Sequence, residues 1–144
     1  MNHKRVFLAA LAGFVAYFAC GFLAFGLGLA NAYRDYSALY RPAEEIQKLF
    51  PVGMVSTFVG LLVLAVIYAK GYEGGSGLAE GARFGVLIGI FSVCTFVLHN
   101  YVNLRIGLKL TIQEALAYFF EWLVVSIVIG LVYRPRVAGP KSAS

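Results

Sequence analysis

The chain has 144 residues, of which 60% are hydrophobic and 13% are charged, and its mean hydropathy is +0.79. Typical soluble domains contain roughly 45–50% apolar and about 25% charged residues, so this chain has too few charges to cover a surface that faces water. The composition excludes a soluble enzyme, a disordered protein and a disulfide scaffold, and it indicates a protein surrounded by lipid.

The net charge of +5 comes from single Lys and Arg residues spread along the chain. Recognition of nucleic acid needs a basic stripe with base-stacking aromatic residues, which this pattern does not provide, so we expect no nucleic-acid partner. Cys20 and Cys94 both lie within apolar runs, and their number and spacing indicate neither a disulfide nor a metal site. We therefore expect no metal and no cofactor.

Four stretches are long and apolar enough to cross the ~30 Å hydrocarbon layer of a membrane. The predicted spans are residues 6–30, 52–69, 84–104 and 112–133. Glu121 interrupts the last apolar run, at a cost on the order of a few kcal/mol that the neighbouring apolar residues offset. The sequence thus predicts an all-α integral membrane four-helix bundle of two antiparallel hairpins within residues 1–135, followed by a flexible polar tail at 136–144.

The connection between the first two spans contains a second helical signal. Pro42 is followed by Glu44 and Glu45, and a proline with nearby acids favours a helix start. The following apolar residues are Ile46, Leu49 and Phe50. We expect a short interfacial helix here, with these apolar side chains on the bilayer surface.

The distribution of Lys and Arg predicts the orientation of the chain. With the N-terminus inside, seven of these residues lie on the inner side of the membrane and five on the outer side. Cytoplasmic segments carry more positive charge, so we expect the cell (inner) membrane with both termini cytoplasmic.

The third span carries small and polar residues on one face. Gly81, Gly85 and Gly89 recur every four residues. The polar residues that continue this stripe are Ser92, Thr95, His99 and Asn103. In lipid, helices associate through close backbone approach and interhelical hydrogen bonds, so the stripe is predicted to face protein.

The fourth span carries a polar face of its own, formed by Glu114, Tyr118 and Glu121 at positions i, i+4 and i+7. The hairpin places Glu121 at the depth of Ser92 and Thr95, so we expect the polar faces of the third and fourth spans to meet in a seam. The other spans add small residues that would let four helices pack closely around it. These are Gly13, Tyr17, Gly21, Ala24 and Gly28 in the first span and Gly53, Ser56 and Gly60 in the second.

Glu121 has two interpretations. An ionised carboxylate near the midplane is expensive, so we expect Glu121 to take up a proton. The neutral acid can act as an interhelical hydrogen bond, or it can titrate in a transport path with His99 and Glu114 as a relay. For His99, a packing role is favoured over metal or haem ligation, because no second span contains a histidine.

Charged residues also mark the ends of spans. Glu80 and Arg83 are expected either as a helix-end ion pair or as a docking point for a partner or an anionic lipid. Arg41, Glu44 and Glu45 are candidates for the same docking or lipid contact. The chain has no hydrolase, metalloprotease or Cys-x-x-Cys motif, so we expect no enzyme.

Three segments carry a resemblance to a known family. They are Tyr40–Glu45, Glu80–Gly85 together with Gly89, and the end of the fourth span at Gly130 and Tyr133. Through them the chain resembles a family of small bacterial four-span integral membrane proteins without a known activity. The resemblance covers most of the chain except its tail, and it implies a class of protein but no chemistry.

Two functional hypotheses follow. The first is a non-enzymatic membrane protein, in contact with membrane lipid, that self-associates or is an accessory subunit of a larger membrane complex. The alternative is a small proton-coupled transporter or carrier with Glu121 as its titrating site.

Overall fold

The computed structural model describes residues 1–134. Its elements in chain order are α1 (His3–Gly21), the π-helix η1 (Phe22–Gly28), α2 (Ala30–Arg34), the 3-10 helix η2 (Ser37–Leu39), α3 (Ala43–Gly71), α4 (Gly77–Ser92), the π-helix η3 (Val93–Val97), α5 (Leu98–Asn103) and α6 (Leu108–Tyr133). The described residues contain no strand, which confirms the all-α prediction. The tail predicted at 136–144 lies outside the described residues.

Four helical segments are long and apolar enough to cross a membrane, as the sequence predicted. They are His3–Gly28, Ala43–Gly71, Gly77–Asn103 and Leu108–Tyr133. In the first, η1 continues α1, and in the third, η3 joins α4 to α5. Each of these two segments therefore contains a stretch of wider π-helical turns, a feature often found at functional sites.

Local sequence accounts for where the helices begin and turn. The side chain of Asn2 accepts a hydrogen bond from the backbone N–H of Arg5 at 3.2 Å and so caps the start of α1. α3 begins directly after Pro42, with Glu44 in the first turn, where the helix dipole favours an acid. The connection between α3 and α4 turns at Gly74, whose φ of 94° favours glycine.

The short helix expected at residues 42–50 was wrongly placed. That segment forms the first turns of α3, which continues through Pro51 to Gly71. Pro51 and Gly53 separate it from the apolar run that follows, and the helix continues through both. The short helices between the first two spans are α2 and η2 instead.

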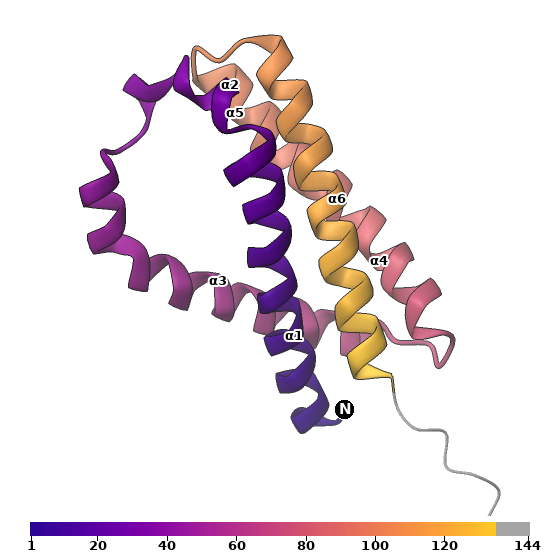
Figure 1. Ribbon diagram of the computed structural model, residues 1–144. Coiled ribbons are helices and arrows are strands. Elements are labelled where there is room, and N and C mark those ends of the chain that lie inside the picture. Colours follow the sequence, from indigo (N-terminus) through magenta and orange to yellow (C-terminus); the bar gives the residue numbers. More distant parts are fainter. Residues whose placement is uncertain (135–144) are drawn as a thin grey trace, which may run out of the picture.

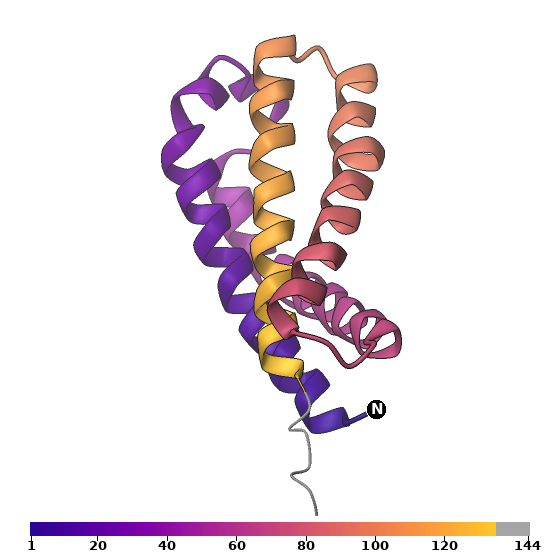
Figure 2. The same ribbon diagram turned by 90° about the vertical axis from the view of Figure 1, so that its right-hand side faces the viewer.

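α6 is the central helix of the molecule. Figure 2 shows it standing between α1 on one side and α4 on the other, and these two helices make its main contacts. α4 and α6 run antiparallel, as a short connection between α5 and α6 requires (Figure 2). The N-terminus and the end of α6 lie at the same end of the bundle (Figure 1).

α3 leans away from the other three spans. In Figure 1 it crosses behind α1 obliquely, and its beginning stands well apart from the bundle. Its buried residues, Leu61, Ala65 and Tyr68, all lie in its second half, whereas residues 43–53 are exposed. A groove of about 390 Å³, lined by Tyr17 and Phe18 of α1, opens against this first half.

The main core therefore lies at the end of the bundle that holds the N-terminus. It contains residues from three helices: Val6, Ala9 and Ala10 of α1, Leu61, Ala65 and Tyr68 of α3, and Val125, Ile129 and Tyr133 of α6. The rings of Tyr68 and Tyr133 meet edge to face at 5.9 Å. The expectation that Gly53 and Gly60 would help four helices pack closely was wrong, because nothing lies within 4 Å of a Cβ placed at either.

Candidate functional site

The glycine ridge of α4 packs directly against the backbone of α6. Gly81, Gly85 and Gly89 are all buried. A Cβ added at residue 81 would stand 2.8 Å from the carbonyl oxygen of Ser126, and one at residue 85 would stand 2.9 Å from Cα of Leu123. Only glycine permits this approach, so the expected packing surface of the third span is occupied by α6.

The acidic face of α6 points elsewhere. At ~100° per residue, Glu121 and Leu123 lie roughly 160° apart around the helix, so the face that meets α4 is not the face that carries the acids. On the acidic side, a Cβ at Gly13 of α1 would stand 3.0 Å from Ile129 and 3.7 Å from Val125. The acids of α6 therefore face α1.

Glu121 is the most deeply enclosed acid on this face, with 3% of its surface exposed. A Cβ at residue 21 would stand 3.0 Å from its Oε1, so Gly21 of α1 leaves the space that this carboxyl occupies. Tyr17 and Cys20 lie four residues and one residue before Gly21 in α1, close to this carboxyl. Its Oε2 is buried and has no hydrogen-bond partner among the described residues.

Glu114 lies on the same face, nearer the start of α6, and is 7% exposed. Its Oε1 accepts a hydrogen bond from the hydroxyl of Tyr33 in α2 at 2.7 Å. Burial, and then this hydrogen bond, raise the pKa of Tyr33, so the phenol stays protonated and remains the donor. The backbone N–H of Gly107 also donates to the hydroxyl of Tyr36 at 2.9 Å, so α6 and the segment before it hold the connecting segment at two points.

Tyr118 lies between the two acids along α6. The centroid of its ring lies 4.7 Å from that of Phe25 in η1 and 5.3 Å from that of Phe96 in η3. Both π-helices therefore meet α6 at this tyrosine. Glu114, Tyr118 and Glu121 follow one another at positions i, i+4 and i+7 on one side of α6, so the three residues form one continuous polar strip, the acidic strip.

The polar seam expected between the third and fourth spans is not formed. Thr95, His99 and Asn103 are exposed, and Ser92 is half-buried. Thr95 donates to the carbonyl of Phe91 at 2.7 Å and Asn103 to that of His99 at 2.9 Å, so both bond within their own span. The reason is geometric, because the glycine ridge takes up the opposite side of α6 and leaves the acidic strip to α1.

Glu80 and Arg83 do not form the expected ion pair. The carboxylate of Glu80 accepts from the backbone N–H of Glu73 at 3.1 Å and from that of Gly75, so it fastens the connection between α3 and α4. Arg83 is exposed, and both residues line a pocket of about 330 Å³.

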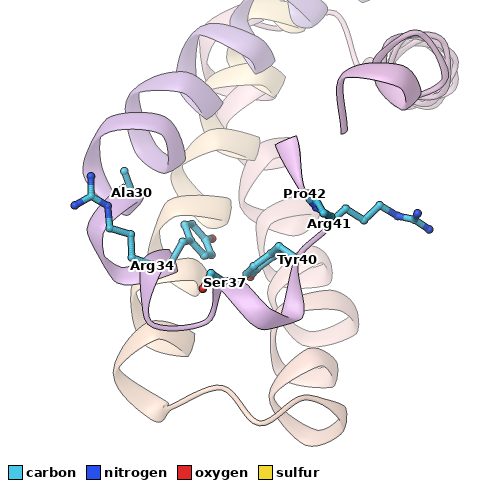
Figure 3. Close-up of a pocket in the computed structure, with 7 residues that line it drawn as sticks. Ala30, Arg34, Ser37, Tyr40, Arg41 and Pro42 are labelled. Carbon is cyan, nitrogen blue, oxygen red and sulfur yellow. The ribbon is translucent and has the colours of Figure 1, made fainter. Parts of the chain in front are cut away.

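The charged residues before α3 lie at the surface. Arg41 pairs with Glu45 at 3.0 Å, and Glu44 is exposed. Arg41 and Arg34 border a pocket of about 540 Å³, but they extend in opposite directions away from it, while Ser37 and Tyr40 lie between them (Figure 3). Burial and the nearby Glu114 raise the pKa of Tyr40. Because the arginines diverge, the pocket does not form a clamp for an anion.

Sequence reasoning missed the partners of the acidic strip. Tyr33 and Tyr36 lie in a connecting segment whose pattern does not indicate which helix they contact. Tyr17 and Gly21 were recognisable as one face of the first span, yet nothing in their spacing pairs them with Glu121. Within residues 1–134 no group of three His, Cys, Asp or Glu side chains could hold a metal ion.

Comparison with known proteins assigns the chain to a family. No curated protein and no solved structure matches it. One family model, DUF1761, described as a protein of unknown function, matches residues 8–130. The match includes almost all of the four apolar helices and the whole acidic strip. The chain belongs to the DUF1761 family of proteins of unknown function.

Proposed function

We propose that this protein is a non-enzymatic integral membrane protein that self-associates through α3. The observation that carries the proposal is the contrast between two small-residue faces. The ridge on α4 is filled by the backbone of α6, whereas Gly53, Ser56 and Gly60 lie on one face of α3 and are all exposed. Small residues in a membrane helix allow close backbone approach of another helix, and here a second copy of the chain supplies it.

Substitution of Gly60 tests this proposal without disturbing the protomer. Nothing lies within 4 Å of a Cβ at this residue, so Gly60→Leu leaves the contacts within one chain intact. At ~100° per residue, Val55 points roughly 140° away from Gly60 and is 65% exposed, so Val55→Leu is the matched control.

Energy transfer between differently labelled copies in lipid vesicles measures the association. We expect wild type and Val55→Leu to associate and Gly60→Leu to lose most of the signal. A wild type that stays monomeric in vesicles, or a Gly60→Leu variant that associates like wild type, would contradict the proposal. In the first case, capture of other membrane proteins from the native membrane would support an accessory subunit instead.

The proposal includes a place in the cell. We propose the inner membrane of a bacterium, with both termini cytoplasmic, membrane lipid as the surrounding partner and no nucleic-acid partner. The support is the excess of Lys and Arg on the side of the termini, seven against five. Attaching a reporter that is active only in the cytoplasm to the end of α6 tests the orientation.

A second function is favoured by one specific observation, the buried carboxyl of Glu121 whose Oε2 has no partner. Acids inside membrane spans are expensive and commonly serve proton paths, so we propose a small proton-coupled carrier as the alternative. In liposomes with a trapped pH-sensitive dye, Glu121→Gln is expected to abolish proton flux. Glu44→Gln, which alters an exposed acid, is the control and is expected to retain it.

A further inference from the structure

The surroundings of Glu121 contain no positive charge. The titratable groups that face it are Tyr17 and Cys20 from α1 and Tyr118 from its own helix. All three are neutral near pH 7 in their ordinary state. The one ion pair among residues 1–134 joins Arg41 and Glu45, at the surface. No cation therefore holds Glu121 in its ionised form, and a proton is the counterpart that this carboxyl can bind.

We propose that Glu121 is a proton-binding site in the membrane interior, which exchanges its proton with water at the α2 end of the bundle along Tyr118 and Glu114. With a rise of ~1.5 Å per residue, Tyr118 lies about 4.5 Å from Glu121 along the helix axis, and Glu114 about 10 Å. A hydroxyl and a carboxyl can each accept and donate a proton, so the acidic strip offers a relay with one further water molecule per gap.

The opposite direction is closed by apolar packing. Beyond Glu121, toward the end of the bundle that holds the chain's N-terminus, the next residues on this side of α6 are Val125 and Ile129. Neither has any exposed surface. They pack against Gly13 of α1 and belong to the main core. The buried hydroxyl of Ser126 lies roughly 140° around the helix from Glu121 and faces α4, so it does not continue the acidic strip. We therefore infer that the proton leaves toward α2.

The hydrogen bond from Tyr33 to Glu114 covers the α2 end of the acidic strip. At 2.7 Å, it holds α2 over the end of the acidic strip, where Glu114 is buried and Tyr33 is half-buried. η1 begins one residue after Gly21, beside Glu121, and its Phe25 contacts Tyr118, so the π-helical turns line the same route. Breaking the Tyr33 bond should therefore admit water to the strip.

This inference rests on the second function proposed above, because a proton-coupled carrier needs a site of this kind. The two can fail separately. If Glu121 titrates but the protein carries no proton flux, the proton-binding site is supported and the carrier function is contradicted. If proton flux occurs while Glu121 does not titrate, the proposal that Glu121 is the proton-binding site is contradicted.

Infrared difference spectroscopy of the full-length protein in lipid tests the site itself. The neutral carboxylic acid has a C=O stretch that the carboxylate lacks, and we expect a band of this kind to disappear as the pH is raised. The band should be absent from Glu121→Gln and present in Glu114→Gln. Glu121→Asp keeps an acid at this position and should keep a titrating band, which covers the case in which the glutamine variant does not fold.

Two results would overturn the site. Glu121→Gln spectra that keep every titrating carboxyl band of the wild type would be the first, because each band would then belong to another of the seven acids. A band assigned to Glu121 that never changes with pH would make the residue a permanent hydrogen-bonding group.

The native Cys20 reports on the route of access. It lies beside Glu121, and in a Cys94→Ser background it is the remaining thiol of the chain. We expect a water-soluble methanethiosulfonate reagent to modify it slowly in the otherwise unchanged protein and at least several-fold faster after Tyr33→Phe. Tyr40→Phe removes a hydroxyl from the pocket that Tyr33 also lines but breaks no bond to Glu114, so it is the control and should leave the rate unchanged. Equal rates in the Tyr33→Phe and Tyr40→Phe proteins would overturn the proposed route.

Discussion

Substitution of Gly81 by alanine should separate the two most closely packed helices. The added Cβ would stand 2.8 Å from the carbonyl oxygen of Ser126 and 2.9 Å from Cα of Ile127. Both atoms belong to backbone, so no side-chain rotation relieves the overlap. Ordinary contact begins at 3.4 Å, so α4 and α6 must move apart by about 0.6 Å, a gap that forfeits roughly a quarter of the dispersion energy of the affected contacts.

The movement also opens the contacts made by the other glycines of the ridge, because the helix shifts as a unit. We therefore expect the free energy of unfolding to fall by about 1–3 kcal/mol, the usual cost of overpacking a well-packed interface. Alanine favours a helix over glycine by roughly 1 kcal/mol, which offsets a part of this loss.

Reversible unfolding in mixed micelles, followed by the fluorescence of Trp122, measures this change. Trp122 is the single tryptophan of the chain, and its ring lies 5.5 Å from that of Tyr17, so the signal reports on the packing of α1 against α6. Gly71→Ala is the control, since this helical glycine has nothing within 4 Å of an added Cβ. A Gly81→Ala protein that is as stable as the Gly71→Ala protein would refute backbone contact between α4 and α6.

Three further predictions concern the acidic strip and the residues that lie apart from it. Gly21→Leu should lower the free energy of unfolding by about 1–3 kcal/mol, and by clearly less in a Glu121→Ala background, since the two side chains compete for one space. Tyr33→Phe should cost about 1–3 kcal/mol, because it leaves a buried oxygen of Glu114 without its donor. Thr95→Val should change stability by no more than about 0.5 kcal/mol, since Thr95 is exposed and bonds only within its own span.

The same unfolding assay checks all three. Equal costs of Gly21→Leu in the two backgrounds would show that residues 21 and 121 do not touch. Tyr40→Phe is the control for Tyr33, and equal effects of the two would argue against the Glu114 hydrogen bond. A large loss of unfolding free energy on Thr95→Val would instead support a polar seam between the third and fourth spans.

The helices themselves followed from the sequence with good accuracy. The four apolar runs predicted the four long helices, because an apolar stretch of this length in lipid must satisfy its backbone groups within a helix. The glycine spacing at residues 81, 85 and 89 also pointed to the surface on which α4 packs. The start of α3 was misjudged because the span was taken from the uncharged run at 52–69, whereas the helix already begins at Ala43 and continues through Pro51.

The partners of polar residues were harder to predict. His99 and Asn103 share the face of the glycine ridge in sequence, yet they lie beyond the π-helical turns of η3, where the third span has moved out of close contact with α6. The π-helix adds residues to each turn and so changes which face continues the stripe. Its presence could not be inferred from the residue spacing.

What the sequence alone determined is that this chain is helical, matched to a membrane and provided with buried acids on one side of its last span. The tertiary structure decided which neighbour each side of α6 receives. Two sides of this helix meet protein, the side with Leu123 and Ser126 and the side with the acidic strip, and either could have met the third span. The glycines of α4 need a backbone to lie against, and the carboxyl of Glu121 needs the space left by Gly21. Since lipid provides neither, both needs are met only when α6 lies between α4 and α1.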